Sequence, residues 1–426
     1  MEGVILRDKI IARIFSFFII VSSISLCIYN KFLKPVGYEY EVIALNLLNN
    51  RGYSGAFLTN RPEPTAFMCP FYPFLLYLNF KLFGKNNYLF IQILQTVLIA
   101  MIPVLVFLTF RLLYRKNNFW ILVMFLLDFP YFLFSGYIGV PVLLSFLIAL
   151  TIFLTAKLSL ESSPKLQVLM GIIGGLGLLT DPVFLLTLVP CLIYLFIKMK
   201  EKWRISIPVI LILIIIFPWL YRNYNLFNAI ILKNQAGLNL FLGNNPYATG
   251  GIYDKEGDGY PLTVKKCLKE DTLEFYKLNE YQRDRMLYKF ALKYIKETLR
   301  NEPLKYFSLK LNCLLSYWCG NAWRIRYEEI LKSRGISPSF KKFFLLVLLS
   351  SILLFITMVI GIVKRDSVEF KWLLLSIIIL NMGLYTLTHG HTFTRYRMYI
   401  DSVIIIFCAQ GMSFLCGWLK RRGDVY

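Results

Sequence analysis

Hydrophobic residues occur along this chain in long runs separated by short polar segments. The first run extends from Arg13 to Asn30. The later runs are Tyr88–Phe110, Phe119–Phe134, Ile138–Ala156, Leu166–Thr180, Val183–Ile197, Ile205–Leu220, Phe343–Val363, Trp372–Leu387 and Val403–Leu419. Because a spanning helix needs roughly 20 apolar residues, this pattern predicts about ten membrane crossings. The two runs beside Asp181-Pro182 are short and could instead form a re-entrant hairpin, which would leave the topology unchanged.

The polar gap between the first two runs, Tyr38 to Gly84, is not a simple linker. Its first half is typical of a short amphipathic helix, with these apolar residues among acidic and amide side chains: Val42, Ala44, Leu45 and Leu48. Its second half is rich in proline and ends in an aromatic segment that is too short and too broken to span a bilayer. We expect a shaped external loop that lies at the interface, with the rest of the chain building a cavity around it.

Lys and Arg residues predict the orientation of the runs. With the N-terminus inside, most of the inside segments are basic, as the positive-inside rule requires. These basic segments are RLLYRKN from Arg111, KMKEKWR from Lys198, KRDSVEFK from Lys364 and LKRR from Leu419. The pattern places both termini in the cytoplasm of a cell with the chain in its cytoplasmic membrane. It also requires that NEPLKYFSLKLNCLLSYWCG, from Asn301, lies on the membrane surface without crossing.

The composition agrees with a membrane protein. Hydrophobic residues make up 57% of the chain and charged residues 17%, and the mean hydropathy is +0.58, whereas soluble domains are about a quarter charged. The net charge of +22 would suggest a nucleic-acid partner in a soluble chain. Here much of it is the cytoplasmic excess of Lys and Arg, so we expect membrane lipid and no nucleic acid as partner.

We expect an all-α polytopic membrane protein in three parts. Residues 1–220 form an N-terminal transmembrane bundle that includes the external loop 31–87. Residues 221–342 form an external loop with interfacial helices and are not apolar enough to hold a large independent core. Residues 343–426 form the C-terminal transmembrane helices. The first run is flanked by basic residues and has no small-residue cleavage site, so we interpret it as a retained helix.

Cysteine and histidine give little evidence for a metal or for disulfides. The eight cysteines are scattered, with no CxxC motif. The external ones could pair in an oxidising compartment: Cys69, Cys267, Cys313 and Cys319. His389 and His391 could contact a divalent cation together with a carboxylate, but two histidines alone are weak evidence. No cofactor is therefore certain, and a divalent cation is left open.

Four stretches of the chain form an ordered set of motifs. They are NLLNNRGYS…PTAFMCPFYPFLLYLNFKLFG in the first external loop, GGLGLLTDP, FPWLYRNYNLFNAIILKNQAGLNLFLGNNPYATGG from Phe217, and HGHTFTRYRMYIDS before the last run. In this order they resemble bacterial membrane glycosyltransferases of the GT-C superfamily, which are relatives of protein O-mannosyltransferases and of the lipid A aminoarabinose transferase. The resemblance covers nearly the whole chain.

The resemblance implies a GT-C-type bundle with its active site on the external face. It also implies a polyprenyl-phosphate-linked sugar as donor, a lipid, glycan or protein as acceptor, and a carboxylate of the first external loop as general base. The chain departs from the family at three positions. The aspartate expected shortly before Tyr40 is absent, Pro141 occupies a second acidic position, and Asp181 replaces the usual arginine before Pro182.

Two nearby carboxylates could replace the missing aspartate. Inverting glycosyl transfer needs a base for the acceptor proton and a group that stabilises the leaving phosphate. Glu39 and Glu41 are two residues apart, so on a helix they point to different faces and only one would face a cavity. We favour Glu39, which is adjacent to Tyr40, as the base. Alternatively, both are solvated charges on an amphipathic helix.

Three further acidic residues are candidates. Asp128 lies within a hydrophobic run, where a carboxylate is a functional hypothesis by default because its burial is costly. It could also be a helix-end aspartate that hydrogen-bonds to backbone. For Asp181 a capping role is favoured over catalysis, and Glu63, in a proline-rich turn, is the weakest candidate.

External arginines could bind the donor phosphate. Arg395 and Arg397 lie outside against the charge rule, and a guanidinium matches phosphate bidentately. They could equally be interface anchors together with Tyr396 and Tyr399. Arg222, at another external helix end, could join them.

The remaining candidates for substrate contacts are Tyr40, Tyr396, Asn244 and Asn245. Gly243 and the two asparagines form a turn whose backbone could bind an oxyanion, although a plain turn is the commoner outcome.

The sequence therefore predicts a membrane glycosyltransferase that uses a polyprenyl-phosphate sugar. Two alternatives remain, a non-enzymatic transporter or flippase of lipid-linked glycans and a catalytically inactive relative. A transporter should carry polar residues through several helices. The hydrophobic runs of this chain carry few polar residues, which favours a reaction at the membrane surface over transport of a glycan across the membrane.

Overall fold

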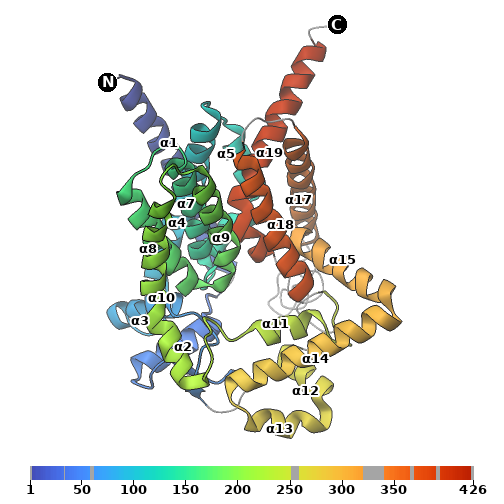
Figure 1. Ribbon diagram of the computed structural model, residues 1–426. Helices are drawn as coiled ribbons and strands as arrows, with labels where there is room; N and C mark the ends of the chain where they lie inside the picture. The colour runs from blue at the N-terminus through green and yellow to red at the C-terminus, as the bar shows by residue number, and fades with distance from the viewer. Residues whose placement is uncertain are drawn as a thin grey trace.

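The apolar runs fold into long helices that lie side by side (Figure 1). The computed structural model describes residues 2–32, 34–57, 62–250, 259–319, 340–364, 369–389 and 394–423. Seven helices within these ranges are long and apolar enough to cross a membrane. They are α1 (Glu2–Phe32), α4 (Leu89–Tyr114), α7 (Pro141–Leu158), α10 (Ser206–Phe227), α17 (Phe340–Val363), α18 (Phe370–Thr388) and α19 (Thr394–Gly423). The all-α polytopic membrane fold expected from the sequence is confirmed.

The other predicted crossings are shorter or broken. The GGLGLLTDP run ends at the 3-10 turn η2 (Pro182–Phe184), which separates α8 (Pro164–Thr180) from α9 (Leu185–Lys198). The run Phe119–Phe134, predicted as one span, is divided into α5 (Trp120–Leu127), α6 (Pro130–Leu133) and η1 (Phe134–Gly136). Pro130 lacks an N–H and cannot continue a helix, which explains why α5 ends just before it.

The core of the bundle lies where α4, α7 and α19 meet, and α19 also packs along α17. The last contact depends on two glycines. A Cβ placed on Gly361 of α17 would lie 2.0 Å from the Phe407 carbonyl oxygen, and one on Gly411 of α19 would lie 2.0 Å from the Thr357 carbonyl oxygen. Only glycine lets the two backbones approach so closely, which is how membrane helices gain packing contacts.

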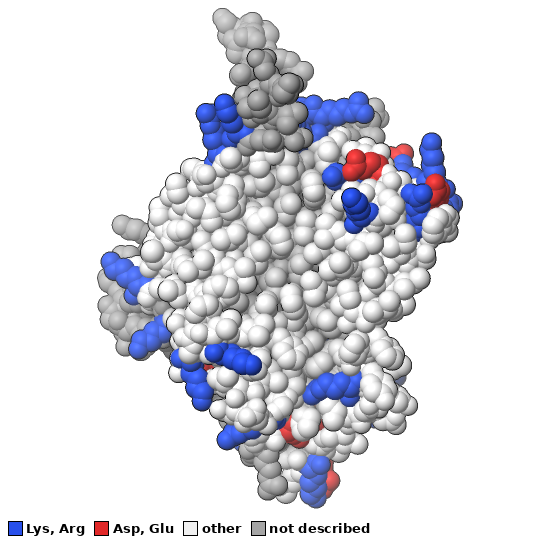
Figure 2. Space-filling model, turned by 90° about the vertical axis from the view of Figure 1, so that its left-hand side faces the viewer, with Lys and Arg blue, Asp and Glu red and all other residues white. Residues whose placement is uncertain are grey.

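The two ends of the bundle differ. Both termini lie at one end, and the helices outside the bundle gather at the other (Figure 1). These are α2 (Tyr38–Leu48), α3 (Phe71–Phe83), α11 (Ala236–Gly243), α12 (Tyr260–Leu268), α13 (Thr272–Lys277), α14 (Glu280–Asn301) and α15 (Pro303–Cys319). Two further 3-10 turns are η3 (Lys202–Ile205) and η4 (Lys269–Asp271). Figure 2 shows a broad uncharged band on one face, with Lys and Arg toward its two ends, as expected of a surface in contact with lipid.

The loop between the first two spans, here called the first loop, is structured, and its helix forms where the sequence predicts it. In α2 the buried residues are Tyr40, Ile43, Ala44 and Asn46. Val42, expected on the apolar face, is exposed, whereas Asn46 is buried because its amide donates to the Ser54 carbonyl at 2.9 Å. After α2, the strands β1 (Ser54–Gly55) and β2 (Glu63–Pro64) pair antiparallel, a hairpin that the sequence did not reveal.

One face of α14 holds the first loop and α11 together. The buried Glu280 carboxylate accepts from the Thr65 hydroxyl, from the Ala66 N–H at 2.9 Å and from the Asn234 amide at 3.1 Å. One turn further, Asp284 accepts from the N–H groups of Gly237 and Leu238, at the start of α11, at 2.8 and 2.9 Å. Burial raises the pKa of both carboxyls.

The partners of Glu280 and Asp284 lie far away in sequence. The external segment and the first loop therefore form one unit. The predicted boundary at residue 221 lies inside α10, which continues to Phe227.

Candidate active site at the external end of the bundle

The start of α2 is strained. Tyr38 has a φ of 45°, in the left-handed region that a bulky side chain rarely adopts. Such strain persists only where the surroundings over-determine it, and it is concentrated at functional sites. Tyr38 immediately precedes Glu39, so the strained residue fixes the direction in which the predicted base leaves the backbone.

Glu39 and Glu41 have different environments. One Glu41 oxygen accepts from the Gly37 N–H at 3.0 Å, and a hydrogen bond with Glu41, after burial, raises the pKa of Tyr88. A Cβ on Gly37 would lie 2.6 Å from the Glu41 Cβ, so the glycine makes this contact possible. Glu39 is half-buried and, within the described ranges, makes no hydrogen bond or ion pair. Glu41 is thus committed to the helix end, and Glu39 is not.

Arg395 and Glu39 both influence the same tyrosine, Tyr137. The Arg395 guanidinium donates to the hydroxyls of Tyr137 and Tyr396, both at 2.9 Å. Burial raises the pKa of Tyr137, the Arg395 charge opposes this shift, and the Glu39 charge adds to it. Tyr137 therefore lies within the electrostatic reach of the candidate base and of a candidate phosphate ligand.

Aromatic rings surround this arginine. The ring of Tyr396 stacks on Tyr385 with centroids 4.4 Å apart and lies 5.9 Å from that of Tyr399. Tyr40 is buried, and burial followed by nearby phenols and acids, among them Asp181, raises its pKa well above the usual value. The first loop, the segment between η1 and α7, α18 and α19 thus meet in one cluster of tyrosines: Tyr40, Tyr137, Tyr385, Tyr396 and Tyr399.

Asp181 lies next to this cluster and has an unexpected partner. One of its oxygens accepts from the Val183 N–H at 3.0 Å, so the expected capping contact is present. The other oxygen pairs with the Lys233 ammonium at 2.7 Å. Burial alone would lower the pKa of Lys233, but Asp181 and its neighbours raise the pKa overall, so the lysine stays charged. Lys233 was not singled out from the sequence, because a lysine in a polar loop looks ordinary.

Arg397 and Asp128 contact each other inside the bundle. The Arg397 Nη2 donates to an Asp128 oxygen, and its Nε donates to Asp401 at 3.0 Å. Its Nη1 donates to the Trp318 carbonyl at 3.1 Å. Arg397, Asp128 and Asp401 are each only 2% exposed. The structure thus brings two predicted site residues together, but in a closed cluster with a second carboxylate that was not predicted from the sequence.

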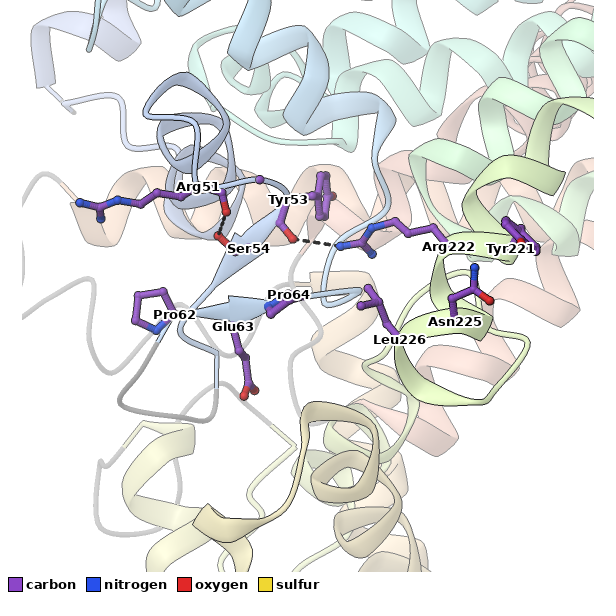
Figure 3. Close-up of a pocket in the computed structure, with 11 residues that line it drawn as sticks. Arg51, Tyr53, Ser54, Pro62, Glu63, Pro64, Tyr221, Arg222, Asn225 and Leu226 are labelled. Atoms are coloured by element: carbon purple, nitrogen blue, oxygen red, sulfur yellow. Dashed lines mark hydrogen bonds between the residues drawn. The ribbon is translucent and has the colours of Figure 1, made fainter.

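Arg222 does not share its contacts with Arg395 and Arg397, the two arginines of α19. Its guanidinium donates to the carbonyls of Thr65 and Tyr53 at 2.9 and 3.0 Å, and it lies 4.6 Å from the centroid of the Trp219 ring. It thus connects the end of α10 to the β1–β2 hairpin (Figure 3). Glu63 of the same hairpin pairs with Arg283 of α14.

Asn244 and Asn245 end α11. Asn244 is fully buried, and its amide donates to the carbonyls of Leu240 and Leu387 at 2.8 and 3.0 Å. Asn245 donates back to Phe241 at 2.9 Å. Close by, the buried Lys310 of α15 donates to the Gly243 and Leu387 carbonyls, both at 3.0 Å, and burial lowers its pKa to about 8. These side chains join α11, α15 and α18.

The histidines and cysteines were considered as possible metal ligands and disulfide partners. His389 is buried, and its Nδ1 lies 2.7 Å from the Thr388 hydroxyl oxygen, whereas His391 lies outside the described residues. The described part of the chain contains no group of three or more His, Cys, Asp or Glu side chains able to hold a metal ion. None of the cysteines is recorded in a disulfide within the part of the chain that the structure describes.

Comparison with known proteins finds a family similarity over part of the chain. Residues 62–221 match the family model described as dolichyl-phosphate-mannose-protein mannosyltransferase. This match confirms the resemblance to GT-C membrane glycosyltransferases that the motifs indicate. Part of the chain is thus similar to this glycosyltransferase family, and its long apolar helices are those of a multi-pass membrane protein.

More distant similarities were also found. Two crystal structures of ArnT from Cupriavidus metallidurans, one bound to undecaprenyl phosphate and one in the apo state, have TM-scores of 0.39 and 0.37. Each is 14% identical and covers 93% of this chain, and the chain covers 77% and 76% of theirs. The class assignment rests on the family match and the motifs. None of the curated proteins compared with the chain matches it significantly.

Proposed function

We propose that the protein transfers a sugar from a polyprenyl-phosphate donor to a hydroxyl group of a lipid, glycan or protein on the external side of the cytoplasmic membrane. The family match supports the donor class, since that family is named for a sugar on a polyprenyl (dolichyl) phosphate. The gathering of the candidate residues at the end of the bundle opposite both termini supports an external site, with the termini in the cytoplasm (Figure 1).

Glu39 is the proposed general base. The observation that carries this assignment is the contrast between the two glutamates of α2, of which Glu41 caps the helix and Glu39 remains uncommitted beside the tyrosine cluster. A carboxylate that is not consumed by structural hydrogen bonds can accept a proton from an acceptor hydroxyl.

Arg395 and Lys233 are the proposed cations for the leaving phosphate. In the reaction the acceptor oxygen bonds to the anomeric carbon as the bond from this carbon to the phosphate oxygen breaks. The acceptor proton passes to Glu39, and the electron pair leaves with the polyprenyl phosphate. The tyrosines hold Arg395 and Asp181 holds Lys233 before substrate arrives, so their charges require little reorganisation when negative charge develops. Tyr40 and Tyr396, in the same cluster, are the proposed substrate contacts.

Arg397 and Asp128 are assigned a positioning role instead of direct contact with substrate. The Arg397 guanidinium already donates from Nε and from both terminal nitrogens to protein acceptors. Two residues before it on α19 is Arg395. The buried cluster therefore fixes the first turns of this helix and, through them, the direction of the Arg395 side chain.

The decisive experiment replaces one glutamate at a time with glutamine. Glu39→Gln should lower transfer of a radiolabelled sugar from polyprenyl phosphate by about 10²–10⁴-fold, the usual contribution of a general base. Glu41→Gln is the matched control, with the same charge loss on the same helix, and should retain transfer within about tenfold. Full transfer by folded Glu39→Gln would exclude Glu39 as the base.

A further inference from the structure

A hollow of about 760 Å³ lies between the β1–β2 hairpin and the external end of α10 (Figure 3). Tyr53, Ser54 and Pro64 line it from the first loop, and Tyr221, Arg222 and Asn225 line it from α10. Of these residues only Arg222 was predicted as a site residue from the sequence. The hollow therefore needs an explanation of its own.

The chemistry of the hollow is cationic. Three of the five N–H groups of Arg222 donate to Thr65, Tyr53 and Asn223. Among the described residues the other two have no acceptor, and no carboxylate pairs with this guanidinium. The one lining carboxylate, Glu63, is paired with Arg283. Arg51 lies at the rim with its side chain directed outward (Figure 3). The hollow therefore favours an anion.

The position of Arg222 matches a membrane interface. Arg204 lies in η3, directly before α10. At the rise of an α-helix it is separated from Arg222 by about 27 Å, close to the roughly 30 Å thickness of a hydrocarbon core. The two arginines therefore lie near the two boundaries of the bilayer, and Arg222 is at the level of the lipid headgroups on the external side.

An apolar stripe leads directly into the hollow. Along α10 these side chains are more than half exposed at helical spacing: Ile210, Leu213, Ile214, Phe217 and Tyr221. From Ile210 to Tyr221 the helix rises about 16 Å, which is the thickness of one leaflet. Phe217 stacks on Tyr221 with centroids 6.0 Å apart, and Tyr221 also lines the hollow. A lipid chain on this stripe would bring its headgroup to Arg222.

We propose that this hollow binds the phosphate headgroup of an anionic phospholipid of the outer leaflet, whose acyl chain lies along α10. The two remaining N–H groups of Arg222 would donate to phosphate oxygens, the geometry that a guanidinium offers best. Because Arg222 also holds the Tyr53 and Thr65 carbonyls, the bound lipid stabilises the first loop against α10.

The test measures lipid preference in nanodiscs. Native mass spectrometry would count phosphatidylglycerol retained by the full-length protein from mixed phosphatidylglycerol and phosphatidylcholine discs. A charge-assisted contact predicts about tenfold enrichment of phosphatidylglycerol. Arg222→Gln and Asn225→Glu should each abolish the enrichment. Asn301→Glu, the same amide-to-acid change at an exposed residue of α14, should leave it intact.

The outcomes separate the alternatives. If Arg222→Gln does not fold, Asn225→Glu decides, since Asn225 is exposed and makes no structural contact in the hollow within the described residues. Enrichment that persists in folded Asn225→Glu overturns the proposal. Displacement of phosphatidylglycerol by an equal amount of polyprenyl phosphate would assign the hollow to the donor. Displacement by millimolar inorganic phosphate would show a site for the anion alone. Either result also overturns the proposal.

Discussion

Arg395 and Arg397 lie two residues apart on the same helix, yet they belong to different regions of the molecule. Arg395 is half-buried among phenols, at the end of the bundle that carries Glu39 and Lys233. Arg397 is buried and is held by Asp128 and Asp401. In the first region two tyrosine hydroxyls accept from the cation. In the second, carboxylates compensate the charge.

The difference shows that a residue's partners, not its type, determine what it can do. Side chains two residues apart on a helix point roughly 200° apart around its axis, because each residue advances about 100°. Arg395 therefore reaches Tyr137, in the segment between η1 and α7, whereas Arg397 reaches α5, α15 and the interior. Four changes test this separation, and their expected effects decrease from the first to the last.

Arg397→Met should have the largest effect. It leaves Asp128 and Asp401 buried without their cation, which typically costs 3–5 kcal/mol. The expected result is a near-complete loss of folded protein, measured by size-exclusion chromatography and thermal unfolding in detergent. The exposed Arg300→Met is the control and should change stability by less than about 0.5 kcal/mol. Wild-type stability of Arg397→Met would remove the distinction between the two arginines.

Arg395→Met should leave the fold intact and weaken binding of the sugar donor. The loss of a charged hydrogen-bonding partner for phosphate corresponds to about 1.5–3 kcal/mol, or roughly a 10–100-fold rise in the donor KM. Steady-state transfer assays would measure this, with thermal unfolding run in parallel. Arg395→Lys should recover part of the affinity. An unchanged KM would make Arg395 an interface anchor only.

Lys310 makes the stability of the protein depend on pH. This dependence tests the inner region, because α15, which carries Lys310, also supplies the Trp318 carbonyl to Arg397. Burial lowers its folded-state pKa to about 8, below its ordinary value. The unfolded chain therefore binds more protons between this value and the unfolded pKa, and stability rises with pH across that range. From pH 8 to 9.5 the gain should be about 1.5 kcal/mol.

The check is thermal unfolding across this pH range in the wild type and in Lys310→Met. The variant has no titrating amine at this position and should lose the rise. If both proteins show the same pH profile, the dependence comes from another group.

Tyr137→Phe should have the smallest effect. It removes one hydrogen bond to Arg395, worth about 0.5–1.5 kcal/mol. Donor KM should rise about 2–10-fold with kcat nearly unchanged, since the tyrosine orients the arginine and does not take part in proton transfer. Tyr131→Phe, in the interior beside the Asp128 cluster, is the matched control and should not move the donor KM.

Features with a local cause could be predicted from the sequence. The spans follow from hydrophobic runs, and α2 follows from its periodicity. Different environments for Glu39 and Glu41 were expected, because residues two apart on a helix point to different faces. The break after Asp128 also has a local cause, because Pro130 cannot continue a helix.

Features that depend on distant partners could not be predicted. Asp128 and Arg397 are 269 positions apart, and Asp181 and Lys233 are 52 apart. Both acids were noticed individually, but periodicity carries no information about which cation reaches them. Glu280, Arg283 and Asp284 are charged and carry no local signal of burial, yet they are buried because the first loop and α11 cover them.

The bond between Thr65 and Glu280 has a consequence for biosynthesis. The two residues are 215 positions apart, so the first loop cannot be completed until α14 has been made and delivered to the same side. At typical synthesis rates of 5–20 residues per second this interval lasts roughly 10–40 s. During that time the nascent chain carries its proposed base on an unfinished loop. The proposed site is therefore incomplete until most of the chain has emerged.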